Sequence, residues 1–304
     1  MPLLRDFIFW LSQKKTFTRP IARTGMRLGF ARRFVAGESL QDGLRVAREL
    51  NARGLQANMN KLGEFVTARS EAEDTCQNYR RILRELAEKN IRGSISIKPT
   101  QLGLTFAPDL CRELTLRIVE EAAALHNFVE IDMEDSPTTE ATVSLFEAVR
   151  RQHPNVGLAI QAYLYRSQKD LERLQPLQPK VRLVKGAYRE PRSVAFPRKK
   201  QVDENYRALL RFLFSNGFRV AVATHDEKML EEAKRIVRER QVAPDRWEFQ
   251  MILGVRRDRQ EALVREGYRM RIYIPFGSEW LPYFLRRLAE RPANMWFVLK
   301  AMLF

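Results

Sequence analysis

The feature of this sequence that most restricts its fold is a regular alternation of short β-rich runs with longer helical runs, beginning near residue 55. The expected strands occupy residues 57–64, 94–98, 128–134, 156–164, 181–188, 219–224, 248–253 and 269–276. Helical patterns separate or follow them at 70–89, 108–125, 138–151, 166–174, 201–215, 227–240, 258–265 and 279–290. Roughly eight β/α units in ~240 residues are typical of a TIM-type barrel, so we predict an α/β fold, a (βα)8 barrel with extra N-terminal helices.

The first 54 residues differ from the rest, because they read as helices without intervening strands. Apolar residues recur at helical spacing from Leu3 to Leu11, and Ser39 is placed to cap a helix at 40–53 that Gly54 would end. We therefore expect an N-terminal helical segment, residues 1–54, that packs on a barrel formed by residues 55–304. The absence of a low-complexity linker favours one structural unit.

The chain is strongly basic, with 53 lysine and arginine residues against 37 aspartate and glutamate residues and a net charge of +16. Before Gly37, only Asp6 opposes the basic residues Arg5, Lys14, Lys15, Arg19, Arg23, Arg27, Arg32 and Arg33. This pattern is interpreted either as a solvated helix face or as a basic amphipathic surface that meets anionic lipid. Nucleic acid is disfavoured as a partner, because no binding motif accompanies the charge.

Cysteine and histidine are scarce in this chain. Cys76 and Cys111 are the only cysteines, and His126, His153 and His225 are the only histidines. Such scattered residues predict neither a metal site nor a disulfide framework, which favours a reducing cytoplasm. No uninterrupted apolar stretch approaches the ~18 residues of a transmembrane helix. A signal peptide is not expected either, because charges interrupt the first apolar run and no small-residue cleavage site follows it.

Polar side chains gather where the expected strands end. They are Lys98, Asp132, Glu134, Gln161, Tyr163, Arg182, Lys185, Tyr188, Thr224, His225, Gln250 and Tyr273. In a (βα)8 barrel the carboxyl ends of the strands meet at one mouth, where ligands bind. A single polar residue there would be explained by helix capping or by contact with water, but that explanation weakens when nearly every strand ends in this way. The pattern indicates an enzyme for a polar, anionic small molecule.

The last helical pattern contains a second signal, the adjacent residues Arg286 and Arg287 followed by Glu290. On a solvated helix these residues would form ordinary ion pairs at i, i+3 and i, i+4 spacing. Near a barrel mouth, two adjacent arginines would instead bind a carboxylate in bidentate fashion. No dinucleotide-binding glycine motif, phosphate-binding loop or zinc-peptidase motif occurs, so the residues alone do not name the reaction.

Several motifs nevertheless occur in a distinctive order. They are Arg-Leu-Val-Lys-Gly-Ala-Tyr at 182–188, Ala-Thr-His at 223–225, Glu-Phe-Gln at 248–250, Arg-Ile-Tyr-Ile-Pro at 271–275 and Tyr-Phe-Leu-Arg-Arg-Leu-Ala-Glu at 283–290. Lys98, Ile-Asp-Met-Glu-Asp at 131–135 and Gln-Ala-Tyr at 161–163 fit the same pattern. Together they resemble the proline dehydrogenase family in its monofunctional bacterial form, over about residues 55–300. The resemblance implies FAD-dependent oxidation of L-proline to Δ1-pyrroline-5-carboxylate, the first step of proline catabolism to glutamate.

The resemblance also implies where the cofactor binds. FAD would be held noncovalently over the barrel mouth, with Arg182 near flavin N5 as a catalytic cation that tunes the flavin. Arg198 and Lys199 would meet its pyrophosphate. The flavin and its chain would be lined by Met133, Gln161, Lys185, Gly186, Ala187, Thr224 and His225.

The substrate site follows from the same resemblance. The proline carboxylate would be held by Arg286, Arg287 and Lys98, with Asp132 and Glu290 as their acidic partners, and the ring by Tyr188, Ile252, Tyr273 and Tyr283. Hydride would pass from the carbon beside nitrogen to flavin N5, with orientation as the main catalytic device. A cation-rich pocket would lower the pKa of the proline amine and favour its reactive neutral form. That Asp132 also accepts the amine proton is a hypothesis.

Partners and alternatives complete the sequence-based expectations. The resemblance implies a membrane quinone as electron acceptor, which would give the basic N-terminal helices a use as a peripheral contact on the inner face of the cytoplasmic membrane. It also implies a pyrroline-5-carboxylate dehydrogenase as the next enzyme. Hydroxyproline or another cyclic imino acid stays open as substrate, because one hydroxyl changes discrimination by only ~1–3 kcal/mol in an apolar pocket. A nucleic-acid-binding protein or a ligand-free barrel would leave the polar strand ends unexplained.

Overall fold

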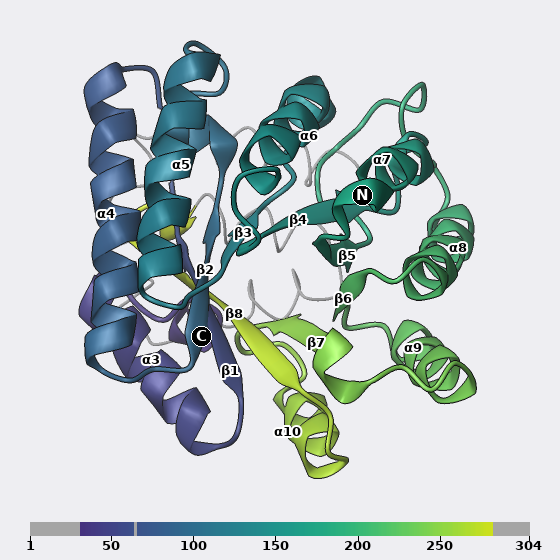
Figure 1. Cartoon of the computed structure of the whole chain (residues 1–304). Coiled ribbons are helices and arrows are strands. Elements are labelled where there is room, and N and C mark those ends of the chain that lie inside the picture. Colours follow the sequence, from purple (N-terminus) through teal and green to yellow (C-terminus); the bar gives the residue numbers. More distant parts are fainter. Residues whose placement is uncertain (1–30, 64–65, 282–304) are drawn as a thin grey trace, which may run out of the picture.

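The computed structural model describes residues 31–63 and 66–281 of the chain. Its centre is a closed parallel barrel in which each strand pairs with the next and β8 pairs with β1 (Figure 1). The strands are β1 (Gln56–Lys61), β2 (Gly93–Ile97), β3 (Val129–Ile131), β4 (Val156–Gln161), β5 (Lys180–Val184), β6 (Arg219–Ala223), β7 (Trp247–Ile252) and β8 (Met270–Phe276). The predicted (βα)8 barrel is therefore confirmed.

Helices form a ring outside the strands (Figure 1). They are α3 (Leu40–Ala52), α4 (Arg69–Glu88), α5 (Pro108–Ala124), α6 (Ser136–Arg150), α7 (Ser167–Leu174), α8 (Lys199–Ser215), α9 (Glu227–Glu239) and α10 (Arg257–Arg265). Short 3-10 turns occur at η1 (Ala31–Arg33), η2 (Pro99–Leu102), η3 (Gln175–Leu177) and η4 (Pro244–Arg246). The expected helices between residues 40 and 265 are confirmed with small shifts at their ends. The helical pattern from Leu3 to Leu11 lies outside the described residues, and the one at 279–290 almost wholly so.

Four strands end three or four residues earlier than the sequence patterns predicted, whereas the other strand ends differ by at most one residue. The expected strands at 57–64, 128–134, 156–164 and 181–188 end instead at Lys61, Ile131, Gln161 and Val184. The backbone beyond these points still bonds to its neighbours, as Asp132 N does to Ile97 O at 2.9 Å and Tyr163 N to Lys185 O at 2.9 Å, but it no longer continues the ladder. In three of these runs, residues beyond the strand end such as Leu62, Met133 and Leu164 are still buried, so a strand-like pattern continues into the loops that form the barrel mouth.

Helix α3 belongs to the ring that packs on the barrel. Ser39 Oγ accepts the Asp42 N–H at 3.1 Å, and Asp42 Oδ2 accepts the Ser39 N–H at 3.1 Å, so the predicted N-cap is confirmed as a capping box. Gly43 of α3 lies against β1 and β8, where an added Cβ would fall 2.6 Å from Met59 Cε and 3.2 Å from the Phe276 ring. Glycine therefore allows α3 to approach the strands without displacing the end of the Met59 side chain.

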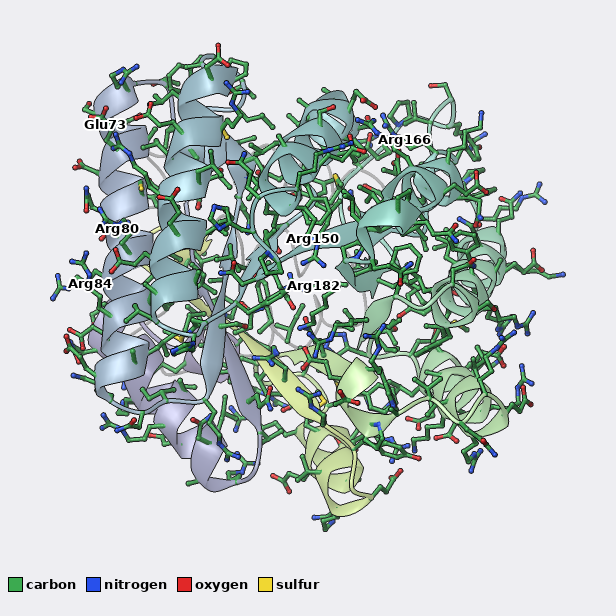
Figure 2. All side chains as sticks on the ribbon, in the orientation of Figure 1. Glu73, Arg80, Arg84, Arg150, Arg166 and Arg182 are labelled. Carbon is green, nitrogen blue, oxygen red and sulfur yellow. The ribbon has the colours of Figure 1, made fainter. Side chains whose placement is uncertain are left out.

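Many basic residues on the outer helices are neutralised by neighbouring carboxylates. Arg80 and Arg84 line the outer face of α4 (Figure 2), and both bond to Glu121 of α5, at 2.7 and 2.6 Å. None of the helices within residues 31–63 and 66–281 combines the length and apolar character needed to cross a bilayer. Of the basic N-terminal residues, Arg5 to Arg27 lie outside the described part of the chain.

Candidate active site

Four of the residues singled out in the sequence converge on one another at the carboxyl end of the barrel, which we call the mouth. Asp132, just after β3, is the centre of this cluster. Its Oδ2 accepts hydrogen bonds from Lys98 Nζ at 2.8 Å and from Tyr273 Oη at 2.7 Å, and its Oδ1 accepts one from Arg182 Nη1 at 2.5 Å. Two of the side chains come from β5 and β8, and the other two from the residues directly after β2 and β3, so barrel closure brings them together. Figure 2 shows Arg182 within the ring of strands.

Both cations of this cluster are buried and charged. Lys98 is 7% and Arg182 is 5% exposed. Burial lowers the pKa of Arg182 to about 10, which still leaves it protonated at neutral pH. Burial is the largest single influence on the pKa of Lys98 and would lower it, but Asp132, Tyr188 and Tyr79 together outweigh burial, so the pKa lies above its ordinary value. The mouth therefore presents two fixed positive charges around one carboxylate.

Three supporting residues were missed in the sequence. Asn60 Oδ1 accepts a bond from Lys98 Nζ at 3.1 Å, Ser96 Oγ accepts one from Arg182 Nη2 at 2.7 Å, and Glu130 forms an ion pair with Arg182. The signal that could have found two of them is the two-residue period of a strand. Ser96 lies two residues before Lys98 and Glu130 two residues before Asp132, so each pair shares the inward face.

A second ionic layer lies inside the barrel below the mouth. Lys180, two residues before Arg182, bonds Glu130 at 2.7 Å and Glu248 at 2.8 Å, and Arg271 bonds Glu248 at 2.8 Å. Gln250 belongs to this layer rather than to the strand end, because its Nε2 donates to Glu130 at 3.0 Å and to Glu248 at 2.8 Å. The interior is thus filled by paired charges instead of the branched apolar residues that usually fill such barrels.

The ends of β3 and β4 are joined by side-chain bonds. Gln161 Nε2 donates to the Glu134 carbonyl at 2.8 Å, and the Glu134 carboxylate accepts from Thr100 N at 2.9 Å and Thr100 Oγ1 at 2.6 Å. Met133, between the two acidic residues of this segment, is buried. These bonds fix the segment after β3, which contains the predicted flavin contact Met133, to the end of β4, which contains the predicted contact Gln161.

The segment after β5 contains the predicted flavin contacts from Lys185 to Tyr188. Lys185 Nζ donates to Asp226 at 2.7 Å and to Asp203, so it is already paired with two carboxylates. Gly186 has φ +116°, and a Cβ there would collide with the Tyr163 ring. Only glycine fits that conformation and that space. Ala187 and Tyr188 are half-buried.

The ends of β6 and β7 are also linked. His225 Nε2 accepts the Ile252 N–H at 3.0 Å, which leaves Nδ1 to carry the proton of a neutral imidazole. Thr224 is buried, and its Oγ1 accepts the Asp226 N–H at 3.2 Å. These bonds hold Thr224, His225 and Ile252 at the mouth, where the sequence placed them.

Arg198 and Lys199 stand at the start of α8. Arg198 is exposed immediately before the first helical residue, Lys199. Lys199 Nζ bonds Asp203 and lies 3.3 Å from Asp226 Oδ2. A helix N-terminus with two cations favours an anion, although Lys199 shares its charge with carboxylates. The remaining predicted site residues, Tyr283, Arg286, Arg287 and Glu290, lie outside the described residues.

The fold and the cluster at its mouth define a class of protein, a (βα)8-barrel enzyme that places buried cations around one carboxylate. Comparison with known families narrows this class. The model of a family described as proline dehydrogenase matches residues 43–300, so this chain belongs to the proline dehydrogenase family, which is flavin-dependent, and is an enzyme of that family. The resemblance found in the sequence motifs is confirmed.

Relatives agree with this assignment. The chain is 40% identical over 301 residues to proline dehydrogenase 1 of Bacillus subtilis, covering 99% of both chains. It is 37% identical over 278 residues to a proline dehydrogenase of Deinococcus radiodurans, covering 90% of both. Among solved structures, proline utilization A from Bdellovibrio bacteriovorus, inactivated by N-propargylglycine, superposes with a TM-score of 0.83 at 22% identity. That match covers 94% of this chain but 36% of the larger protein, and it supports the fold alone.

Proposed function

We propose that this enzyme oxidises L-proline to Δ1-pyrroline-5-carboxylate with FAD as its flavin. The observation that carries the proposal is the cluster at the mouth, in which Lys98 and Arg182 are held 2.8 and 2.5 Å from opposite oxygens of Asp132. A buried site with fixed cations suits an amino acid carboxylate and an anionic reduced cofactor. Proline dehydrogenase activity, which the family membership establishes, requires a site for the substrate carboxylate and a site for the flavin.

The residues at the mouth fit a flavin. Arg182 Nε is buried without a hydrogen-bond partner in the described part of the chain, so this donor is left for a bound group. The exposed cation Arg198 at the start of α8 suits a diphosphate. When bound, FAD supplies the hydride acceptor of the reaction. We assign its binding to the predicted residues Met133, Gln161, Arg182, Lys185, Gly186, Ala187, Arg198, Lys199, Thr224 and His225.

The substrate contacts are assigned to the opposite side of the cluster. Lys98 binds the proline carboxylate together with Arg286 and Arg287, and Tyr273 packs against the ring with Tyr188, Ile252 and Tyr283. The Tyr273 ring already lies against both cations, with Lys98 Nζ 6.0 Å and Arg182 Cζ 5.3 Å from its centroid. Glu290 serves as an acidic partner of the arginines.

Asp132 acts mainly by orienting its neighbours. Three donors already occupy its two oxygens, so its carboxylate fixes both cations and the Tyr273 hydroxyl in one geometry. Whether it also accepts the amine proton is tested by the pH dependence of kcat/KM. An Asp132→Ala variant that keeps the full kcat/KM at every pH would remove this residue from proton transfer.

An absorbance spectrum of the purified enzyme, repeated after anaerobic addition of L-proline, tests the proposal. We expect a flavin band that bleaches with proline. Lys98→Met should slow the bleaching, whereas Lys169→Met, which removes an exposed charge on α7, should not. A flavin band that persists after addition of proline would indicate that another imino acid is the substrate. A protein that neither binds FAD nor oxidises proline would refute the proposal.

Hydroxyproline is the second candidate substrate, because one hydroxyl changes discrimination by only ~1–3 kcal/mol in an apolar pocket. The ratio of kcat/KM for L-proline to that for hydroxyproline decides between them. We expect proline to be preferred, and a ratio below one would reverse the assignment.

The acceptor and location of the enzyme are also proposed from the family. Electrons would pass to a membrane quinone. Residues 1–54 would form a helical segment whose basic residues contact the inner face of the cytoplasmic membrane. A pyrroline-5-carboxylate dehydrogenase would be the partner that takes the product. Removal of residues 1–33 should weaken binding to anionic liposomes while leaving proline-dependent bleaching intact. Unchanged liposome binding would contradict this use of the segment.

A further inference from the structure

The amino end of the barrel, opposite the mouth, contains a second concave site. A cavity of about 260 Å³ opens where the strands begin, between Gly93 of β2, Phe128 before β3 and Lys180 of β5 on one side and Arg219 of β6 and Trp247 of β7 on the other. Its volume is just below the range of roughly 300–1,000 Å³ for small-molecule sites. The space therefore suits a small ion rather than a nucleotide.

The walls of this cavity are predominantly basic. Five of its lining residues are lysine or arginine, namely Lys180, Arg219, Arg246, Arg269 and Arg271, against the two acidic residues Asp245 and Glu248. The formal balance is thus 5 − 2 = +3. Such a positive concavity concentrates anions.

Only part of this charge is neutralised inside the protein. Lys180 and Arg271 belong to the inner ionic layer, where Glu130 and Glu248 balance them. The other three arginines form no ion pair with any described residue. Arg246 donates to the Gly217 carbonyl, and Arg269 Nη1 donates to the Asp245 carbonyl at 2.9 Å. Carbonyl groups orient a guanidinium but leave its charge uncompensated.

Two neighbouring cations have lowered pKa values, mainly because of burial and in part because of nearby positive charge. Burial, reinforced by Arg271 and Arg269 against the opposing effect of Glu248, lowers the pKa of Lys180 to about 8. Burial and the charge of Arg219 also lower the pKa of Arg150, whose guanidinium donates only to carbonyls in the described structure. Neighbouring guanidinium groups thus add to the effect of burial at Lys180 and Arg150, and a bound anion would relieve that repulsion.

We propose that this cavity binds a small multivalent oxyanion, such as a phosphate or a short polycarboxylate, through Arg219, Arg246 and Arg269. The planar guanidinium group suits both classes, because it bonds two oxygens of one anion at once. The inner wall is formed by Lys180 and Arg271, whose fixed positions close the site toward the barrel interior. Proline itself carries a single carboxylate beside a positive amine and is poorly matched to this set of groups.

The test is isothermal titration calorimetry of the flavin-loaded enzyme with sodium phosphate and, separately, with citrate, at ionic strength held constant with sodium chloride. We expect saturable binding of at least one anion. Arg219→Gln combined with Arg269→Gln should weaken it by about tenfold or more, because each charge-assisted contact contributes strongly. The preferred anion identifies the class of the natural ligand.

A matched control separates this site from general charge effects and from the mouth. Arg48→Gln combined with Arg238→Gln removes two exposed arginines of α3 and α9 and should leave anion affinity unchanged. Both double variants should oxidise proline as the unmodified enzyme does, which shows that the barrel is folded. Absence of saturable binding by either anion, or equal affinity in the Arg219/Arg269 variant, would overturn the proposal.

Discussion

The ion pair between Lys98 and Asp132 provides the sharpest test of the site. Both side chains are buried, and Nζ and Oδ2 are 2.8 Å apart. In Asp132→Asn, Lys98 and Arg182 lose a shared counter-charge, and breaking a buried pair of this kind costs about 3–5 kcal/mol of unfolding free energy. Lys98→Met should cost less, because Asp132 keeps its bonds from Arg182 at 2.5 Å and Tyr273 at 2.7 Å.

The double variant decides whether the two residues act together. In the double variant Asp132 is neutral, so replacing Lys98 removes a buried charge that has lost its counter-charge. The losses of unfolding free energy from the two substitutions should therefore not add. We expect the double variant to lose about 1–3 kcal/mol less unfolding free energy than the two single variants lose together. Urea unfolding of the flavin-free enzyme, followed by circular dichroism, measures all four proteins under one condition.

A surface ion pair supplies the control for this cycle. Arg117 and Glu113 of α5 lie 2.6 Å apart with side chains 50% and 51% exposed. Solvent screens such a pair, so its coupling should stay below about 1 kcal/mol. If the losses for Lys98 and Asp132 add within about 0.5 kcal/mol, as for independent sites, the buried ion pair at the mouth is not formed in solution and the reasoning fails.

Three further predictions follow from single positions. Tyr273→Phe removes a donor 2.7 Å from the shared carboxylate and should lower kcat/KM for proline by roughly tenfold to a hundredfold; an unchanged value in steady-state kinetics would contradict this role. Gly186→Ala, which collides with the Tyr163 ring, should reduce the flavin content, measured by absorbance, more than Gly267→Ala, which has a similar positive φ but no atom within 4 Å of an added Cβ. Burial opposes ionisation of Asp226, but its lysine partners hold its pKa at about 2, below the ordinary 3.8. The Asp226 carboxylate therefore stabilises the folded state fully above pH 3.8, and this stabilisation is lost as the pH falls toward 2. As the pH is lowered over that interval, the unfolding free energy of Asp226→Asn, measured by urea unfolding, should fall less than that of the unmodified enzyme. Identical pH profiles of the two proteins would refute this.

Much of the mouth was predictable because strand ends are readable in a sequence. Lys98 and Asp132 each follow a β-rich run, and a barrel must bring such ends together. Gln250 was placed there as well, but it lies in the inner layer because its strand continues to Ile252. The sequence patterns locate a strand to within a few residues, and two residues along a strand separate the mouth from the layer below.

The partners of each charge were beyond the reach of the sequence. Lys185 was expected to meet the flavin and is found paired with Asp203 and Asp226, from α8 and from the N-cap of α9. Glu130 was unremarked, although it connects Arg182 to Lys180. These pairs join residues 18 to 52 positions apart, and only the closed barrel and the helices that pack on it decide which charges meet.

The sequence by itself determined the alternation of strands and helices, the barrel it implies, and the residue types at its mouth, because periodicity and strand-end chemistry are local properties of the chain. Tertiary structure alone decided that Asp132 holds both Lys98 and Arg182, that the barrel interior is filled by paired charges, and that arginines without a carboxylate partner among the described residues line a cavity at the opposite end. The physical reason is that the energy of a charge depends on its burial and on its neighbours in space, and closure of the barrel sets both.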